Sequence, residues 1–266
     1  MIVALSVGNA HVTIGLMNRE KALFIDHADT DVRKTDLEYS FDIMRVFSAH
    51  NVDLSEVTGG VVSSVVPQLS LIMATAVERV FHFVPYLVSA KKQHSLKIDI
   101  EHPSSLGANL LADAVAVKKY YGTPAVLVDM GTATSIGVLD RNAVYKGGAI
   151  VPGLGSGIRA LIGGTAALPP LRLTGAETVL AVDTPVCINS GSVYGNAAMI
   201  DGMINRMIAE LREEAPEHAA DDFKIVMTGR LSELVAPNMR HKVILDEALT
   251  LKGLSLLYEE KKEAEK

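Results

Sequence analysis

Two stretches half a chain apart share one pattern: a strand, a glycine turn and a second strand. The first copy reads LSVGNA at residues 5–10 and continues into Ile14-Gly15; the second reads VDMGTA at 128–133 and continues into Ile136-Gly137. Both copies lead into a third strand after a charged turn, and the downstream helices and strands follow in matching order. The repeat therefore predicts an α/β fold of two duplicated domains that face each other, with both glycine turns in one nucleotide cleft.

The repeat divides the chain into two expected domains, residues 1–118 and residues 119–266. In the first domain, Thr35 has the residue type of a helix N-cap, and Glu38 stands where a capping box requires it. A further helix is expected from about Gly107 to Gly122. The closing helix, whose charged end is expected to fray, falls within the second domain by this division.

Composition narrows the classes of partner. The net charge is −6, with an isoelectric point near 5.8, which excludes the basic surface that nucleic acids and anionic membranes require. The one cysteine, Cys187, excludes an intramolecular disulfide framework and is expected to be a small buried residue. The apolar run at residues 2–5 is too short for a signal peptide or a membrane span, so the cytoplasm is the expected location.

The glycine turns carry the predicted chemistry. A tight turn after a buried strand lets backbone N–H groups approach anionic oxygens, and threonine hydroxyls add donors. The second copy supplies Gly131, Thr132 and Thr134 as phosphate-binding residues, with Asp129 as a cation ligand. The first copy supplies Gly8 and Asn9 without a charge, because Ser6 occupies the place where such a loop usually carries an acid. The chain contains no G-x-x-x-x-G-K-[ST] element, which argues against a P-loop nucleotidase.

An ordered set of motifs along nearly the whole chain resembles the type III pantothenate kinases, which belong to the acetate kinase/Hsp70/actin (ASKHA) superfamily. These motifs are SVGNAHVTIGLM, DVRKTDLEY, VVSSVVP, EHPSSLGANLLADA, DMGTATS, GGAIVPGL, TAALP, SGSVYG, VMTGRL and LTLKGL. The resemblance implies two actin-like, ribonuclease H-like domains and an ATP-dependent kinase that phosphorylates pantothenate in coenzyme A biosynthesis. It also implies a homodimer that uses Mg²⁺ and a monovalent cation, K⁺ or NH₄⁺.

The chain departs from the family pattern at residues that carry chemistry. Ser6 replaces the acid of the D-x-G-N-T loop, and the G-A-D-R motif reads Gly107-Ala108-Asn109-Leu110. Asn109 therefore stands at the family's general-base position, where an amide cannot accept a proton. Ile100 replaces an aromatic residue expected near pantothenate. Gly107 and Thr184 match substrate-binding positions, and Asp129 matches the position of the monovalent cation ligand.

These substitutions leave two functions open. The chain is either a kinase that is slow on pantothenate or redirected to a related alcohol, or a catalytically inactive homologue that acts as a nucleotide-binding regulatory or structural subunit. Asp113 lies one helical turn after Asn109 and is a candidate replacement for the lost carboxylate. The other interpretation of Asp113 is an acid that makes structural hydrogen bonds at a helix surface or a dimer contact.

Overall fold

A computed structural model of the chain describes residues 1–92, 94–214 and 221–266. The chain forms two compact units. Unit 1 consists of Met1–Lys119 together with Ala248–Lys266, and unit 2 consists of Tyr120–Glu247. Each unit is a mixed α/β structure built on its own sheet, as the sequence repeat predicts.

Unit 1 is built on a five-stranded sheet of order β3-β2-β1-β4-β5. The first three strands form an antiparallel meander, while β4 pairs parallel with both β1 and β5. The elements of unit 1 are β1 (Ile2–Val7), β2 (His11–Asn18), β3 (Lys21–Asp29), α1 (Asp36–Ala49), η1 (Leu54–Glu56), β4 (Gly59–Ser64), α2 (Pro67–Phe81), β5 (Tyr86–Leu87), β6 (Lys97–Ile98), η2 (Pro103–Ser105), α3 (Ala108–Ala116) and α7 (Leu249–Ala264).

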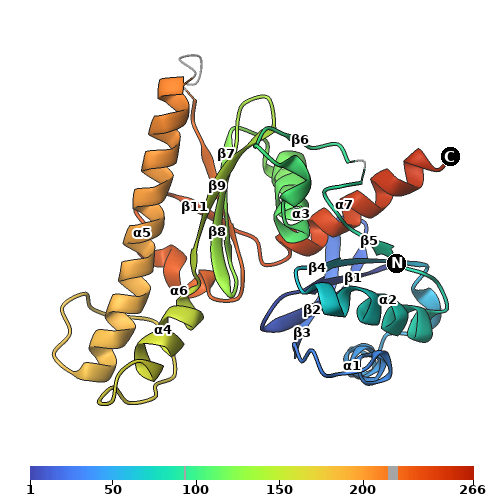
Figure 1. The fold of residues 1–266 in the computed structure, drawn as a ribbon, viewed down its shortest axis with the longest axis horizontal. Helices are drawn as coiled ribbons and strands as arrows, with labels where there is room; N and C mark the ends of the chain where they lie inside the picture. Colours follow the sequence, from blue (N-terminus) through green and yellow to red (C-terminus); the bar gives the residue numbers. More distant parts are fainter. Residues whose placement is uncertain (93, 215–220) are drawn as a thin grey trace. The chain divides into compact units, whose positions relative to one another are not determined.

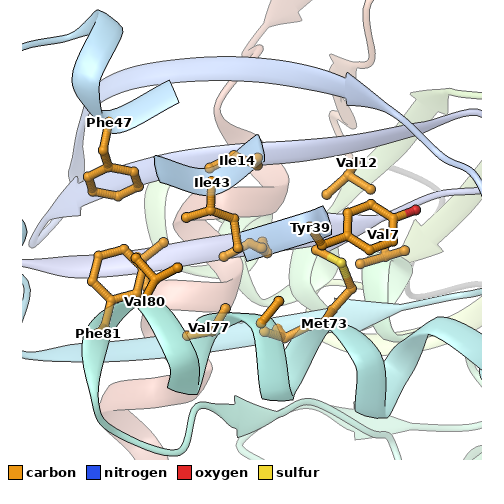
Figure 2. Packing of buried hydrophobic residues seen from close by; sticks show 14 of the residues in the cluster. Val7, Val12, Ile14, Tyr39, Ile43, Phe47, Met73, Val77, Val80 and Phe81 are labelled. Carbon is orange, nitrogen blue, oxygen red and sulfur yellow. The ribbon is translucent and has the colours of Figure 1, made fainter. Parts of the chain in front are cut away.

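Helices α1 and α2 cover one face of this sheet. Figure 2 shows side chains of the two helices packed together over residues of β1 and β2. The labelled residues are Val7, Val12, Ile14, Tyr39, Ile43, Phe47, Met73, Val77, Val80 and Phe81. The capping box predicted at α1 is confirmed, because Thr35 caps the Glu38 N–H and the Glu38 carboxylate accepts from the Thr35 N–H.

Helices α3 and α7 lie at the opposite face. A Cβ on Gly15 of β2 would overlap Leu251 of α7, and one on Gly59 of β4 would overlap Tyr258. The two helices cross closely at Gly253, where a Cβ would stand 1.9 Å from the Ala112 carbonyl oxygen. Helix α7 is therefore part of unit 1, whereas the boundary at residue 118 places it in the second domain. The buried leucines of α7 must pack against another element to leave water, and they pack against the sheet of unit 1.

Unit 2 repeats the meander. Its strands follow the order β11-β10-β7-β8-β9, with β7, β8 and β9 antiparallel and with β10 parallel to both β7 and β11. The elements are β7 (Ala125–Met130), β8 (Ala133–Leu139), β9 (Val144–Pro152), α4 (Leu154–Gly163), α5 (Thr184–Glu214), β10 (Lys224–Thr228), α6 (Ser232–Val235), η5 (Ala236–Asn238) and β11 (Val243–Leu245). A π-helical turn, η3 (Val117–Tyr121), precedes β7 and ends before Gly122.

The core of unit 2 lies between this sheet and helices α4, α5 and α6. Helix α5 runs as a long rod beside the sheet (Figure 1) and directs Ile200, Ile204 and Ile208 toward β7, β8 and β10. This apolar stripe follows the helical spacing seen in the sequence. In the described ranges of the chain, no helix is both long enough and apolar enough to cross a membrane.

Candidate active site

Asp129 lies in the middle of a polar row on the sheet of unit 2. Its register partners are Thr228 in β10 and Ser135 in β8. Residues directly opposite one another on paired strands project from the same face, so the three side chains are neighbours. The row therefore presents one carboxylate flanked by two hydroxyl groups.

Ser6 occupies the equivalent place in unit 1. Its register partners are Ser63 in β4 and Thr13 in β2, so three hydroxyl groups stand where unit 2 has a hydroxyl, a carboxylate and a hydroxyl. Thr13 continues the row to His27 in β3, since the Thr13 Oγ1 and His27 Nδ1 atoms lie 3.2 Å apart. The duplication seen in the sequence is thus also present in the strand registers. Because Ser6 replaces a carboxylate, the row of unit 1 lacks the negative charge that Asp129 gives to the row of unit 2.

The glycine turn of unit 2 is held closely by its neighbours. The Gly131 N–H donates to the Ala133 carbonyl oxygen across 3.0 Å, so it is used within the hairpin, while Thr132 is exposed. Gly153, which caps α4, packs so tightly that a Cβ there would stand 2.3 Å from the Gly131 carbonyl oxygen. Gly229 has a φ of +97° and lies against Met130, so a side chain there would be both strained and obstructed. Only glycine allows the backbone of these two neighbours to approach the turn so closely.

The turn of unit 1 is also closed by hydrogen bonds. The Gly8 N–H donates to the His11 carbonyl oxygen across 2.9 Å, and the Thr30 hydroxyl donates to the Gly8 carbonyl oxygen across 2.7 Å. Asn9, at the tip of the turn, is exposed. The turn is therefore closed by its own hydrogen bonds like its counterpart in unit 2, but it is one residue longer, since Val7 pairs with Val12 whereas Met130 pairs with Thr134.

Thr134 lies on the other face of β8 from Asp129. Its side chain alternates with that of Ser135 and shares the core face with Ile136 and Val138. The Thr134 hydroxyl is fully buried and has no hydrogen-bond partner within the part of the chain that the structure describes. Thr134, expected to bind phosphate, and Asp129 thus project from opposite faces of the sheet.

The acceptor motif forms the start of α3 in unit 1. Gly107 is the N-cap residue, and Asn109 lies in the first turn, half-buried, with its Oδ1 2.7 Å from the Ser63 hydroxyl. Asp113, one turn later, is fully buried, and its Oδ1 accepts a 2.7 Å hydrogen bond from the Thr250 hydroxyl of α7. Ile100 is half-buried in the segment before the helix.

Thr184 opens α5 and lines a pocket of about 500 Å³ between α4 and α5. Gly153, which packs on the Thr132 turn, lines the same pocket. Cys187 lines it too and is exposed, which corrects the expectation of a buried residue: it lies near the exposed start of α5, before the apolar stripe. The pocket therefore joins the predicted substrate position Thr184 to the neighbourhood of the phosphate turn.

Burial raises the pKa of Asp129 from its usual 3.8 to about 6. A carboxylate held away from water gains from a nearby cation, and the hydroxyl oxygens of Thr228 and Ser135 are suitable ligands for a hard cation. Among the described residues, no three His, Cys, Asp or Glu side chains come together as a metal site. The donor set around Asp129 thus fits an alkali or alkaline-earth ion and lacks the nitrogen and sulfur ligands typical of zinc.

The family model described as type III pantothenate kinase matches residues 2–206. The chain belongs to the type III pantothenate kinase family. A relative described as a type III pantothenate kinase, from Listeria monocytogenes serotype 4a (strain HCC23), is 32% identical over 262 residues, which cover 98% of each chain. A relative with the same description from Geotalea daltonii is 31% identical over 264 residues, covering 99% of this chain and 100% of the relative.

Solved structures give the same answer for the fold. The component A of (R)-2-hydroxyglutaryl-CoA dehydratase from Acidaminococcus fermentans superposes with a TM-score of 0.56, covering 99% of this chain and 98% of that one at 11% identity. The activator of 2-hydroxyisocaproyl-CoA dehydratase from Clostridium difficile, with bound ADPNP, gives 0.51, covering 99% and 96% at 11% identity. The two-domain α/β class expected from the repeat is confirmed, and so is the actin-like form that the resemblance implies.

Several residues of the two rows were not predicted from the sequence. Ser135 and Thr228 flank Asp129, while Thr13 and Ser63 flank Ser6. Strand alternation shows that Ser135 and Thr134 project from opposite faces, and the hairpin register places Ser135 on the face of Asp129. The positions of Thr228 and Ser63 depend on register between strands far apart in the chain, which no local pattern reveals.

Proposed function

We propose that this chain is an ATP-dependent kinase that phosphorylates pantothenate, or a closely related alcohol, more slowly than family members that keep both acids. The observation that carries the proposal is the contrast between the two rows. Unit 2 keeps its carboxylate at Asp129, two residues before its glycine turn, whereas unit 1 has hydroxyl groups at the matching row and an amide at position 109.

The residues of unit 2 are assigned to the nucleotide. Thr132 and the close backbone of the glycine turn would bind phosphate oxygens, with Gly131 allowing that approach. Asp129 would hold a monovalent cation, K⁺ or NH₄⁺, and Thr184 would line the substrate pocket. A magnesium ion bound with ATP supplies charge neutralisation at the transferring phosphoryl group.

The residues of unit 1 are assigned to the acceptor alcohol and to the phosphate loop that has lost its acid. Asn109 cannot remove the proton of an alcohol, and general-base assistance contributes roughly 10²–10⁴ in rate. Ser6 replaces a charged cation ligand by a neutral hydroxyl group, and Leu110 removes a fixed positive charge. Phosphoryl transfer depends mainly on positioning and electrostatics, so a slow reaction remains chemically accessible.

A second function is favoured by the same substitutions. Loss of both acids from unit 1, with the nucleotide residues of unit 2 retained, is the pattern of an inactive homologue that binds a nucleotide as a regulatory or structural subunit. The two functions differ in a measurable way, because only the first consumes ATP.

The test is ADP release with Mg²⁺, ATP, K⁺ or NH₄⁺ and pantothenate. The wild type is compared with a triple variant that combines Ser6→Asp, Asn109→Asp and Leu110→Arg, and we expect the triple variant to be faster by roughly 10²–10⁴. Asn9→Asp serves as the matched control, since it adds a charge to the same turn without restoring the family pattern.

Wild-type turnover that depends on pantothenate supports the kinase. No wild-type turnover, with activity in the triple variant, supports the inactive homologue instead. If neither protein releases ADP, pantothenate is the wrong acceptor and the proposal fails.

A further inference from the structure

The chain passes from one unit to the other at two places, which we call the crossings. The first crossing lies between Lys119 and Tyr120, and the second lies between Glu247 and Ala248. The first falls inside the π-helical turn η3, and the second falls in the turn just before α7. Because the crossings are the covalent connections between the units, any movement of one unit against the other must change the backbone at or near them.

On the side of unit 2, a side-chain hydrogen bond joins the two crossings. Tyr121 is the second residue of unit 2 and Asp246 is its second-last, and the Tyr121 hydroxyl donates to Asp246 Oδ2 across 2.7 Å. Asp246 is buried and Tyr121 is half-buried. A bond from a hydroxyl group to a carboxylate is one of the stronger hydrogen bonds in proteins. Burial and the Asp246 carboxylate both raise the pKa of Tyr121, so the phenol keeps the hydrogen that it donates.

Both crossings are also attached to one strand of unit 2. The Lys224 ammonium group donates to the Tyr121 carbonyl oxygen, and the Asp246 N–H donates to the Met227 carbonyl oxygen across 2.9 Å. Lys224 and Met227 belong to β10, which pairs with β7 in the sheet. The ends of the crossings in unit 2 are thus fixed on a paired strand, and the Tyr121–Asp246 bond connects them to each other.

On the side of unit 1, the crossings lead into two helices that pack together. Helix α3 precedes the first crossing, and α7 follows the second. The helices meet at Gly253, where a Cβ would stand 1.9 Å from the Ala112 carbonyl oxygen, and the Thr250 hydroxyl of α7 donates to Asp113 of α3. The spacing between the two crossings is therefore held in unit 1 by helix packing and in unit 2 by the tyrosine–carboxylate bond.

Two connections at a fixed spacing restrict movement more than one connection does. A single flexible connection allows rotation about any axis, whereas two connections at a fixed spacing leave rotation about the line through both of them. If the spacing is released in one unit, each crossing can bend separately and further rotations become available.

We infer that the Tyr121–Asp246 hydrogen bond joins the two crossings into one hinge, so that the units move relative to each other about a single axis. The inference goes beyond the proposed function, because it involves no nucleotide, acceptor or catalytic residue. It is tested in the ligand-free chain, so it can fail without affecting the proposed kinase, and the kinase can fail without affecting it.

Pulsed EPR distance measurements test the hinge. One pair of spin labels reports on both units, at Leu71→Cys in α2 and Glu210→Cys in α5, two exposed positions, with the native thiol removed by Cys187→Ser. A second pair, Glu210→Cys and Lys242→Cys, lies within unit 2. Tyr121→Phe removes the hydroxyl group. We expect it to broaden the distance distribution of the first pair and to leave that of the second pair unchanged.

Tyr194→Phe is the matched control. The Tyr194 hydroxyl of α5 donates to the Ala176 carbonyl oxygen across 3.3 Å, within unit 2 and far from both crossings in the chain. We expect this variant to leave both distributions unchanged. An unchanged distribution of the first pair in Tyr121→Phe overturns the inference. Equal broadening of both pairs overturns it too, because that result would show a general loosening of unit 2.

Hydrogen exchange gives a second measurement at the crossings. The Asp246 N–H should exchange roughly 10- to 100-fold faster in Tyr121→Phe, since loss of a hydrogen bond to a charged group changes a local opening equilibrium by a factor of that order. Exchange at the wild-type rate contradicts the connection. If Tyr121→Phe does not fold, Asp246→Asn keeps an acceptor oxygen without the charge, and it is expected to broaden the distribution of the first pair alone, whereas an unchanged first pair overturns the inference.

Discussion

Asp129 is a carboxyl group that the fold holds partly away from water, and its protonation is therefore linked to stability. Its pKa is about 6 in the folded chain against a usual value of 3.8. Well below pH 3.8 the group is protonated in both states and has no effect. As the pH rises toward 6 the unfolded chain releases its proton first, so stability falls, and the full destabilisation is present above pH 6.

We expect Asp129→Asn to stabilise the ligand-free protein at neutral pH. The difference between the two pKa values corresponds to about 3 kcal/mol, which the neutral amide avoids. Urea unfolding at pH 7.5 and at pH 4, in a buffer without K⁺ or NH₄⁺, measures the effect. The variant should be more stable than the wild type at pH 7.5, and most of that difference should be lost at pH 4. Equal stabilisation at both pH values would show that ionisation is not the cause.

The same residue illustrates what the sequence can and cannot predict about the site. The motif identifies Asp129, and the short hairpin after it brings Ser135 to its side. Thr228 becomes its neighbour only through the pairing of β10 with β7, almost 100 residues apart in the chain. Long-range register is set by the packing of whole elements, so a single sequence gives the carboxylate without its complete surroundings.

At the scale of elements, the contact between α3 and α7 assigns a structural role to Asp113. Its buried Oδ1 accepts from the Thr250 hydroxyl, and the two helices meet at Gly253. A buried carboxylate that loses a hydrogen bond destabilises the fold by roughly 1–3 kcal/mol. Thr250→Val should therefore lower the free energy of unfolding by that amount, as measured by urea denaturation.

Thr178→Val is the control for this prediction. The Thr178 hydroxyl also donates to an oxygen, the Leu180 carbonyl at 3.2 Å, but both residues are exposed, so water replaces the lost partner. If the two variants lose the same stability, the contact with Asp113 contributes nothing specific.

Elements whose limits depend on neighbouring residues were predicted more accurately than contacts between elements far apart in the chain. The start of α1 was predicted correctly because Thr35 and Glu38 determine it within four residues. Helix α7 was also expected as a helix, but its apolar face does not state which sheet it covers. Its assignment to unit 1 comes from small residues on both partners, Gly15 and Gly59 of the sheet, whose role is visible only when the surfaces meet.

At the scale of the molecule, unit 1 depends on the last segment of the chain. Helix α7 buries Leu249, Leu251, Leu254 and Leu257. Each buried leucine contributes roughly 1.5–3 kcal/mol, so four contribute an amount similar to the whole stability of a domain. Deleting residues 248–266 should therefore unfold unit 1 and leave unit 2 folded.

Hydrogen exchange measured by mass spectrometry distinguishes the two units. Peptides from β1, β2 and β4 should lose protection in the deletion variant, whereas peptides from β7, β8 and α5 should keep it. A shorter deletion of residues 262–266, which are exposed, is the control and should change neither unit. Retained protection in β1 and β4 would mean that α7 is dispensable for unit 1.

Because the chain passes through unit 2 before it returns to unit 1, the two units are completed in a fixed order during protein synthesis. Residues 1–119 leave the ribosome before unit 2 does, yet they lack the helix that covers one face of their sheet until residues 248–266 emerge. Unit 2 is contiguous and is complete before that moment. We expect unit 2 to reach its native fold during translation before unit 1, whose sheet keeps an apolar face exposed to chaperones until residues 248–266 have been synthesised.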